Sequence, residues 1–389
     1  MPRLKPPDLH LYVHIPFCAH KCHYCDFNSH VRNTPPWKNY QDALLAELDY
    51  WAAQPQFQQR TLTTVFFGGG TPSLAPPALI AAVLDKAVSV FAVETNAEIT
   101  LEANPGTVDE EHFSGYKAAG VNRLSIGVQS FDDTELKWLE RIHNSAEAIH
   151  AYEIARKTGF DNVNLDLMYA LPDQPLQHWQ QRLDTAIRLD PEHLSCYQLT
   201  IEPHTRLAAD HAASPYLLPD QEVALAFFTA TRELLGNHSY AAYEVSNFAR
   251  AGKHCRHNDG YWLYHDYLGI GAGASGKWDT PDGGIYRYSN NRSPETYIHK
   301  AVTDGTAIHS NENLDTQRAA AEAVWLGLRR IDGISRENFT RRFGADVWPM
   351  FESPLRQWRN TEHVQLEETR LLLTPKGLPL ADGIAASVL

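Results

Sequence analysis

The stretch YVHIPFCAHKCHYCDF, residues 12–27, leads from an apolar, strand-like run into Cys18, Cys22 and Cys25, spaced C-x3-C-x2-C. The chain has an odd total of five cysteines, and three thiols this close together suit a metal centre better than a disulfide framework. Iron–sulfur clusters are held by cysteine thiolates, usually four of them. With three local cysteines, one iron of a cubane stays open and can chelate a substrate or cofactor.

Two other uses of these cysteines remain open. A tetrahedral zinc site needs a fourth ligand, and His20 and His23 inside the loop are poorly spaced to supply it. Purely structural cysteines are not expected at an exposed strand end among His and Lys residues. Cys196, by contrast, lies in the apolar run LSCYQL, which is typical of a buried small hydrophobe.

Strand-like and helix-like patterns alternate outward from this stretch. The predicted strands are 9–17, 61–70, 98–106, 123–131, 163–172 and 193–203, and helical patterns lie between them. Such alternation predicts an α/β fold with a parallel sheet, either open or curved partway toward a barrel.

Polar or glycine-rich segments follow five of these strands, so we expect the functional site where the strands end. They are the cysteine loop, GGGTPS, EANPGT, GVQSF and DLMYALP. The segment FFGGGTPS lacks the lysine of a phosphate-binding P-loop, and its glycines either form a plain turn or let the backbone approach a ligand closely.

We predict three domains. Residues 1–205 form the strand–helix repeat, and residues 206–311 form an irregular region rich in aromatics, His and Gly. Residues 312–389 form a small helical or winged-helix-like domain, with helices near 314–330 and 335–344 followed by a strand pair, a turn and a last helix.

The composition limits partners and location. A net charge of −13 argues against a broad nucleic-acid surface, which needs clustered Lys and Arg. The first residues lack the apolar core of a signal peptide, and no apolar run is long enough to span a bilayer, so we expect a cytoplasmic protein.

The cysteine motif, with Tyr24 one place before its last cysteine, resembles the radical SAM superfamily. The segments LEANP, GVQSF, LERIH and NLDLMYALP further resemble the HemN and HemW family, the oxygen-independent coproporphyrinogen III oxidase group, over residues 10–345. The resemblance implies a partial (β/α)6 TIM-like barrel with a HemN-like C-terminal α+β domain, and a 4Fe–4S cluster on Cys18, Cys22 and Cys25. It also implies a site for S-adenosylmethionine (SAM) formed by Tyr12, Tyr24, Gly69, Gly70, Thr71, Glu102, Gln129, Arg141, Asp166 and Thr200.

Phe27 points to one branch of this family. The coproporphyrinogen dehydrogenase branch carries a further cysteine two places after the third, where this chain has Phe27. The segments CDFNS, YEVSNFA, HNDGYW and GIGAGASG instead resemble the HemW branch. That branch implies a heme chaperone that delivers heme to acceptors such as respiratory enzymes. The alternative is a coproporphyrinogen III dehydrogenase, and a zinc-stabilised interaction protein is a third class.

Heme needs aromatic surroundings and an axial ligand, and KHCRHNDGYWLYHDY, residues 253–267, supplies both. The candidate heme ligands are His257, His254 and Cys255; the alternative is that the tyrosines and Trp262 are ordinary packing residues and the histidines lie at the surface. The sequence leaves open whether heme is covalent, whether SAM is cleaved, which protein accepts heme and whether the chain forms a homodimer.

Overall fold

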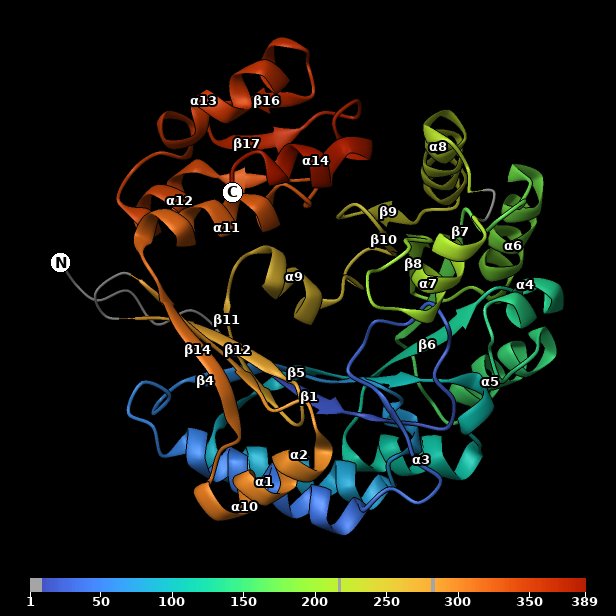
Figure 1. Ribbon diagram of the computed structural model, residues 1–389, viewed down its shortest axis with the longest axis vertical. Coiled ribbons are helices and arrows are strands. Elements are labelled where there is room, and N and C mark those ends of the chain that lie inside the picture. Colours follow the sequence, from blue (N-terminus) through green and yellow to red (C-terminus); the bar gives the residue numbers. More distant parts are fainter. Residues whose placement is uncertain (1–8, 216–217, 281–283) are drawn as a thin grey trace.

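The computed structural model describes residues 9–215, 218–280 and 284–389 (Figure 1). The segment 1–8, on which the signal-peptide argument rests, lies outside the described residues. Across the part of the chain that the structure describes, no helix is both long and apolar enough to cross a membrane.

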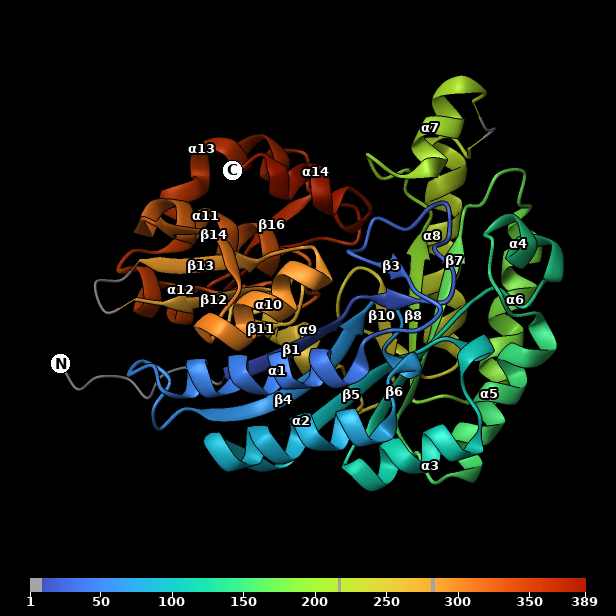
Figure 2. The same ribbon diagram turned by 60° about the horizontal axis from the view of Figure 1, so that its bottom comes forward.

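Six parallel strands form the centre of the molecule, and they confirm the predicted α/β fold. Neighbouring strands in the sheet follow one another in the sequence: β1 (Leu9–Ile15), β4 (Thr61–Gly69), β5 (Ala92–Ala103), β6 (Arg123–Gln129), β7 (Val163–Tyr169) and β8 (His193–Gln198). Helices cover the outer face of this curved sheet (Figures 1 and 2): α1 (Trp37–Ala52), α2 (Pro77–Val90), α3 (Glu110–Ala119), α5 (Ser145–Lys157) and α6 (Leu176–Leu189).

The strands are almost entirely buried because both faces are covered. Every residue of β1 except Tyr12 is buried, and β4 is buried over all but its first residue. Helix ends follow local rules: Asp109 caps the start of α3, Gly120 ends it with a φ of +107°, and Asn144 begins α5 with a capping box. The repeat is therefore set by local sequence and closed by a shared core.

The second region extends the sheet at both edges. On the β8 side lie β10 (Asn247–Ala249) and β9 (Ala241–Ala242), preceded by α7 (Arg206–Ala213) and α8 (Gln221–Asn237). On the β1 side β11 (Asp266–Ile270) pairs in parallel with β1, and β12 (Ser275–Asp279), β13 (Ile285–Asn290) and β14 (Ile308–Leu314) continue antiparallel. The helix α9 (Arg256–Trp262) lies on the face of the sheet opposite α1 and α2, and α10 (Pro294–Asp304) packs on α1 (Figure 1).

The C-terminal region has its own core, and its elements follow the predicted order except for one further helix, Val347–Asn360, which the sequence did not predict. Its helices are α11 (Thr316–Gly327), α12 (Arg336–Phe343), α13 (Val347–Asn360) and α14 (Ala381–Ala386), and its sheet has the order β15 (Ile334–Ser335), β17 (Arg370–Leu373), β16 (Val364–Leu366). The predicted boundary between residues 311 and 312 falls inside β14, whose pairing with β13 ties it to the large sheet. The domain limits themselves stay predictions.

Short elements carry the loops around the sheet. They are β2 (Phe17–Cys18) paired with β3 (His30–Val31), α4 (Asp133–Trp138), and single 3-10 turns at Pro72–Leu74, Pro105–Thr107 and Leu378–Leu380.

Candidate functional site

One cavity of about 400 Å³ gathers most of the predicted site at the carboxyl ends of the parallel strands. All three motif cysteines line it. The predicted SAM residues that also line it are Tyr24, Gly69, Gly70, Thr71, Glu102, Gln129, Arg141, Asp166 and Thr200. They come from loops and strand ends far apart in the sequence, and parallel strands bring such ends to one edge.

The three cysteines are free thiols, and polar groups surround them. Cys18 ends β2 and accepts a hydrogen bond from the Thr71 hydroxyl at 3.3 Å. Arg141 Nη1 lies 3.7 Å from Cys22 Sγ. Burial raises the pKa of Cys18 and of Cys25, and a bound metal ion would favour the thiolate form at both positions.

This donor set fits a cluster better than a single ion. No three His, Cys, Asp or Glu side chains lie close enough to hold one metal ion, as far as the described residues extend. A zinc ion would draw its ligands to about 2.3 Å from one centre, whereas a cubane places each thiolate on a different iron. Three thiols around a cavity of this size therefore fit a 4Fe–4S cluster with one iron open.

The glycines after β4 approach the cysteine-bearing segment. Gly69 has a φ of +117°, and a Cβ there would lie 2.5 Å from the His14 ring. A Cβ on Gly70 would lie 2.9 Å from the Phe17 carbonyl oxygen and 3.0 Å from Cys18 Sγ. The glycines thus let the end of β4 pack against the first cysteine, in addition to any contact with a ligand.

Two half-buried carboxyl groups face the cavity. Burial, together with the nearby Asp166, raises the pKa of Glu102 to about 8, although Glu102 accepts a hydrogen bond from the Gly69 N–H at 3.1 Å. Burial also raises the pKa of Asp166, which accepts hydrogen bonds from Ser125 at 3.0 Å and Asn164 at 2.9 Å. Desolvated carboxyl groups of this kind favour a ligand that brings positive charge or hydroxyl donors.

The opposite charge comes from Arg141. Its Nη2 donates to the Gly127 carbonyl at 2.9 Å, and its buried Nε has no hydrogen-bond partner in the described structure. Gln129 sits beside it at the end of β6 with a φ of +65°, an unusual conformation for a non-glycine residue. Both features suit a site built to hold a polar ligand.

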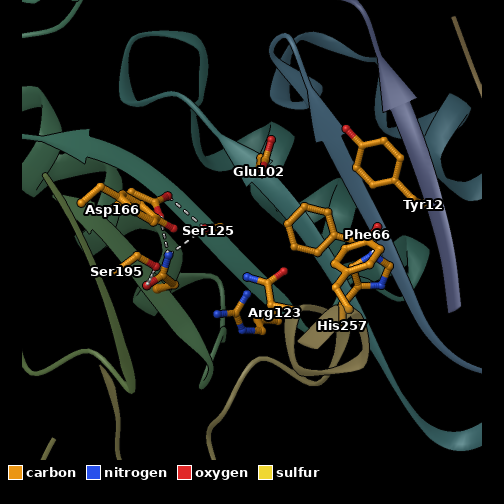
Figure 3. A pocket seen from close by; sticks show the side chains of 12 residues that line it. Tyr12, Phe66, Glu102, Arg123, Ser125, Asp166, Ser195 and His257 are labelled. Carbon is orange, nitrogen blue, oxygen red and sulfur yellow. Dashed lines mark hydrogen bonds between the residues drawn. The ribbon is translucent and has the colours of Figure 1, made fainter. Parts of the chain in front are cut away.

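Tyr12 is the one predicted SAM residue that does not line the cysteine cavity. It lines a smaller inner cavity of about 210 Å³ inside the barrel, and its hydroxyl is 2.9 Å from His14 Nδ1. Figure 3 shows this cavity, with Tyr12, Phe66 and His257 on one side and Asp166 and Ser195 across from them. Glu102 and Asp166 line both cavities, so the two are neighbours.

The predicted heme ligands do not converge. His257 is buried, with Nδ1 2.7 Å from the Thr64 hydroxyl and Nε2 3.0 Å from the Tyr261 hydroxyl. Cys255 is buried near Glu98, at 3.5 Å. His254 is exposed and stacks on Tyr243 at 4.2 Å. Both ring nitrogens of His257 therefore already have partners.

Two contacts near the cluster loop were missed from the sequence. Asn28 donates to the Ala272 carbonyl at 2.8 Å and to the Arg292 carbonyl at 3.0 Å, and a Cβ on Gly273 would lie 2.4 Å from the Asn28 amide. The segments CDFNS and GIGAGASG were noted separately, but nothing in either one indicates that they touch. Glu140 likewise lies 3.5 Å from His20 and 3.9 Å from His23 and also pairs with Arg206.

Comparison with known proteins agrees with this geometry. Residues 12–186 match the radical SAM superfamily, and residues 314–380 match the HemN C-terminal domain. The protein named heme chaperone HemW in Haemophilus influenzae is 40% identical over 387 residues, which cover 96% of this chain and 98% of that one. The chain belongs to the HemW family of radical SAM proteins.

Other relatives extend the similarity. Heme chaperone HemW of Bacillus subtilis is 34% identical over 97% of this chain and 98% of its own, and the mitochondrial radical S-adenosyl methionine domain-containing protein 1 of Danio rerio is 33% identical over 97% and 86%. The solved structure of coproporphyrinogen III oxidase (HemN) from Escherichia coli superposes with a TM-score of 0.84 at 24% identity, covering 100% of this chain and 91% of that one. The HemN structure supports the fold, and the named relatives confirm the HemW branch.

Proposed function

We propose that the chain is a cytoplasmic heme chaperone, which binds heme and delivers it to an acceptor protein such as a respiratory enzyme. The observation that carries the proposal is Phe27, which is 57% exposed and lines the cysteine cavity at the position where the dehydrogenase branch has a further cysteine. The names of the relatives at 34–40% identity support the same function.

The cavity suits two cofactors. Cys18, Cys22 and Cys25 would hold a 4Fe–4S cluster, which when bound supplies electrons to SAM. Arg141 would pair with the SAM carboxylate, and Glu102 and Asp166 would accept hydrogen bonds from ribose hydroxyls. The glycines, Thr71, Gln129 and Thr200 complete the proposed SAM site, with Tyr12 and Tyr24 beside it.

Anaerobic reconstitution followed by heme titration tests this function. We expect a brown protein that loses its colour in air and that gains a Soret band on addition of heme. The heme should then transfer to an acceptor protein without heme, such as a heme-free respiratory cytochrome, so that the chaperone loses its Soret band. A colourless, zinc-containing protein without iron would contradict the cluster. Size-exclusion chromatography before and after reconstitution checks the predicted homodimer.

The competing activity has a direct assay. Incubation of the reconstituted protein with coproporphyrinogen III, SAM and a reductant under anaerobic conditions should give no protoporphyrinogen. Formation of that product would replace the chaperone proposal with the dehydrogenase.

A further inference from the structure

A third hollow lies beside the cysteine cavity, between the cluster loop and the strands β13 and β14. This hollow, the side cleft, has a volume of about 590 Å³ and includes Phe27, Arg292 and His309 in its lining. Phe27 also lines the cysteine cavity, as do Gly69 and Glu102, so the two sites adjoin. Small-molecule and cofactor sites commonly measure roughly 300–1,000 Å³. The side cleft falls in that range, whereas the inner cavity beside His257, at about 210 Å³, does not.

His309 enters the side cleft from a β-bulge. Along the β13–β14 ladder Ser289 pairs with Ser310 and Asn290 with Ile308, which leaves His309 as the extra residue. Bulges re-aim side chains and are frequent next to functional sites. The His309 side chain is exposed and makes no hydrogen bond or ion pair with any described residue. A free imidazole at the rim of a large cleft is an available iron ligand.

The second histidine of the side cleft, His14, is not available in this way. Its Nδ1 is 2.9 Å from the Tyr12 hydroxyl, and its Nε2 is 2.9 Å from the Asn28 carbonyl oxygen. With both ring nitrogens engaged in a buried position, His14 serves to hold the loop.

Arg292 supplies a positive charge at the same rim. The Asn28 amide and His30 Nε2 donate to the Arg292 carbonyl oxygen at 3.0 Å and 3.1 Å, which fixes its backbone. The exposed guanidinium makes a single long contact with described residues, from Nε to Asn28 Oδ1 at 3.4 Å. Its remaining N–H groups can therefore pair with carboxylates of a ligand.

Aromatic side chains form one part of the wall, beside small and polar residues such as Ser275, Ser289 and Ser310. Tyr261 and Tyr267 meet edge to face with ring centres 4.8 Å apart, and Phe27 is 57% exposed at the opening. Tyr261 belongs to the HNDGYW segment, so that segment reaches the side cleft although its histidine points into the inner cavity. A flat apolar macrocycle with an iron and two carboxylates matches this combination of groups.

We propose that heme, the cargo under the proposed function, occupies the side cleft, with His309 as an iron ligand and Arg292 paired with a propionate. The proposal rests on the proposed function, because it assigns a place to the heme that the function requires. It puts the cargo beside the cluster and SAM site, with Phe27, Gly69 and Glu102 lining both.

Heme titration of single histidine variants tests the iron ligand. The full chain is titrated with heme under anaerobic conditions as wild type, His309→Ala and His299→Ala; His299 is an exposed histidine on α10 that does not line the side cleft. We expect His309→Ala to weaken heme binding at least tenfold and to shift the Soret band, and His299→Ala to behave as wild type.

The outcomes separate the two proposals. A wild type that binds no heme refutes both the chaperone function and the side cleft. A wild type that binds heme while His309→Ala keeps the same affinity and spectrum overturns the side cleft alone. Loss of heme in a folded His257→Ala variant, with His309→Ala unaffected, would place the iron at the HNDGYW helix instead.

The propionate contact has its own test with heme dimethyl ester, which lacks the two carboxylates. Wild type and Arg318→Gln, an exposed arginine outside the side cleft, should bind the ester several-fold more weakly than heme. Arg292→Gln should bind the two with nearly equal affinity. If Arg292→Gln still binds heme several-fold more tightly than the ester, the assigned ion pair is wrong.

Discussion

Replacement of Glu102 by Gln should remove the part of the pH dependence of SAM binding that arises from this carboxyl group. The carboxyl group has a pKa of about 8 because it is buried and lies near Asp166, against an ordinary value of 4.5. Near pH 7 the Glu102 carboxyl group of the empty site is therefore mainly protonated. The positively charged sulfonium of SAM favours its ionised form. If SAM holds Glu102 ionised, the dissociation constant should fall about 25-fold from pH 6.5 to pH 8.5.

The direction of the Glu102 pKa shift can be checked from the stability of the protein without SAM. A carboxyl pKa that folding raises contributes stability below pH 4.5, and that contribution is lost as the pH rises through about 8. The difference of 3.5 between the two pKa values corresponds to at most about 5 kcal/mol in the free energy of unfolding. Glu102→Gln keeps an acceptor for the Gly69 N–H, so it should lose less stability than wild type between pH 5 and pH 8.5.

Isothermal titration calorimetry of SAM into the reconstituted protein at pH 6.5, 7.5 and 8.5 measures the effect. The amino group of SAM also titrates in this range, but it contributes equally to wild type and Glu102→Gln. The difference between the two proteins in the slope of log Kd against pH therefore isolates the contribution of Glu102. Glu153→Gln, with a side chain 64% exposed on α5, is the matched control and should follow wild type. An equal slope in wild type and Glu102→Gln would refute the reasoning.

Three further changes probe the cluster region. Gly69→Ala should lower the free energy of unfolding, measured in urea, by about 2–5 kcal/mol, because it adds both positive-φ strain and a clash with the His14 ring. The control Gly159→Ala, with a φ of +90° and nothing within 4 Å, should show only the strain. Equal losses in the two variants would exclude the clash. Cys22→Ser should lose its iron on metal analysis yet keep the heme Soret band, and joint loss would contradict separate sites. Asn28→Ala should shorten the lifetime of the cluster absorbance in air, because it removes two hydrogen bonds that hold the loop, each worth about 1 kcal/mol. An unchanged lifetime would show that these hydrogen bonds do not protect the cluster.

Much of the cluster site could be predicted from short segments. Cys18, Cys22 and Cys25 lie within eight residues, so their proximity follows from chain length alone. Most of the predicted SAM residues lie on or shortly after parallel strands, and such strands end at one edge, so their gathering around one cavity was also within reach of sequence reasoning. Tyr12 lies on β1 itself, and its side chain lines the inner cavity and the side cleft, which its place in the sequence does not indicate.

The sequence by itself determined the three-thiol motif, the order of strands and helices, and the branch indicated by Phe27, because these depend on neighbours along the chain. Only the tertiary structure decided that His257 is enclosed between Thr64 and Tyr261, and that Asn28 meets Gly273. The tertiary structure alone also decided the side cleft, because the cleft exists only where the loop after β2 meets a bulge in β14, nearly three hundred residues later. Local patterns specify elements and their chemistry, whereas contacts between distant segments depend on how the finished sheet brings its edges together.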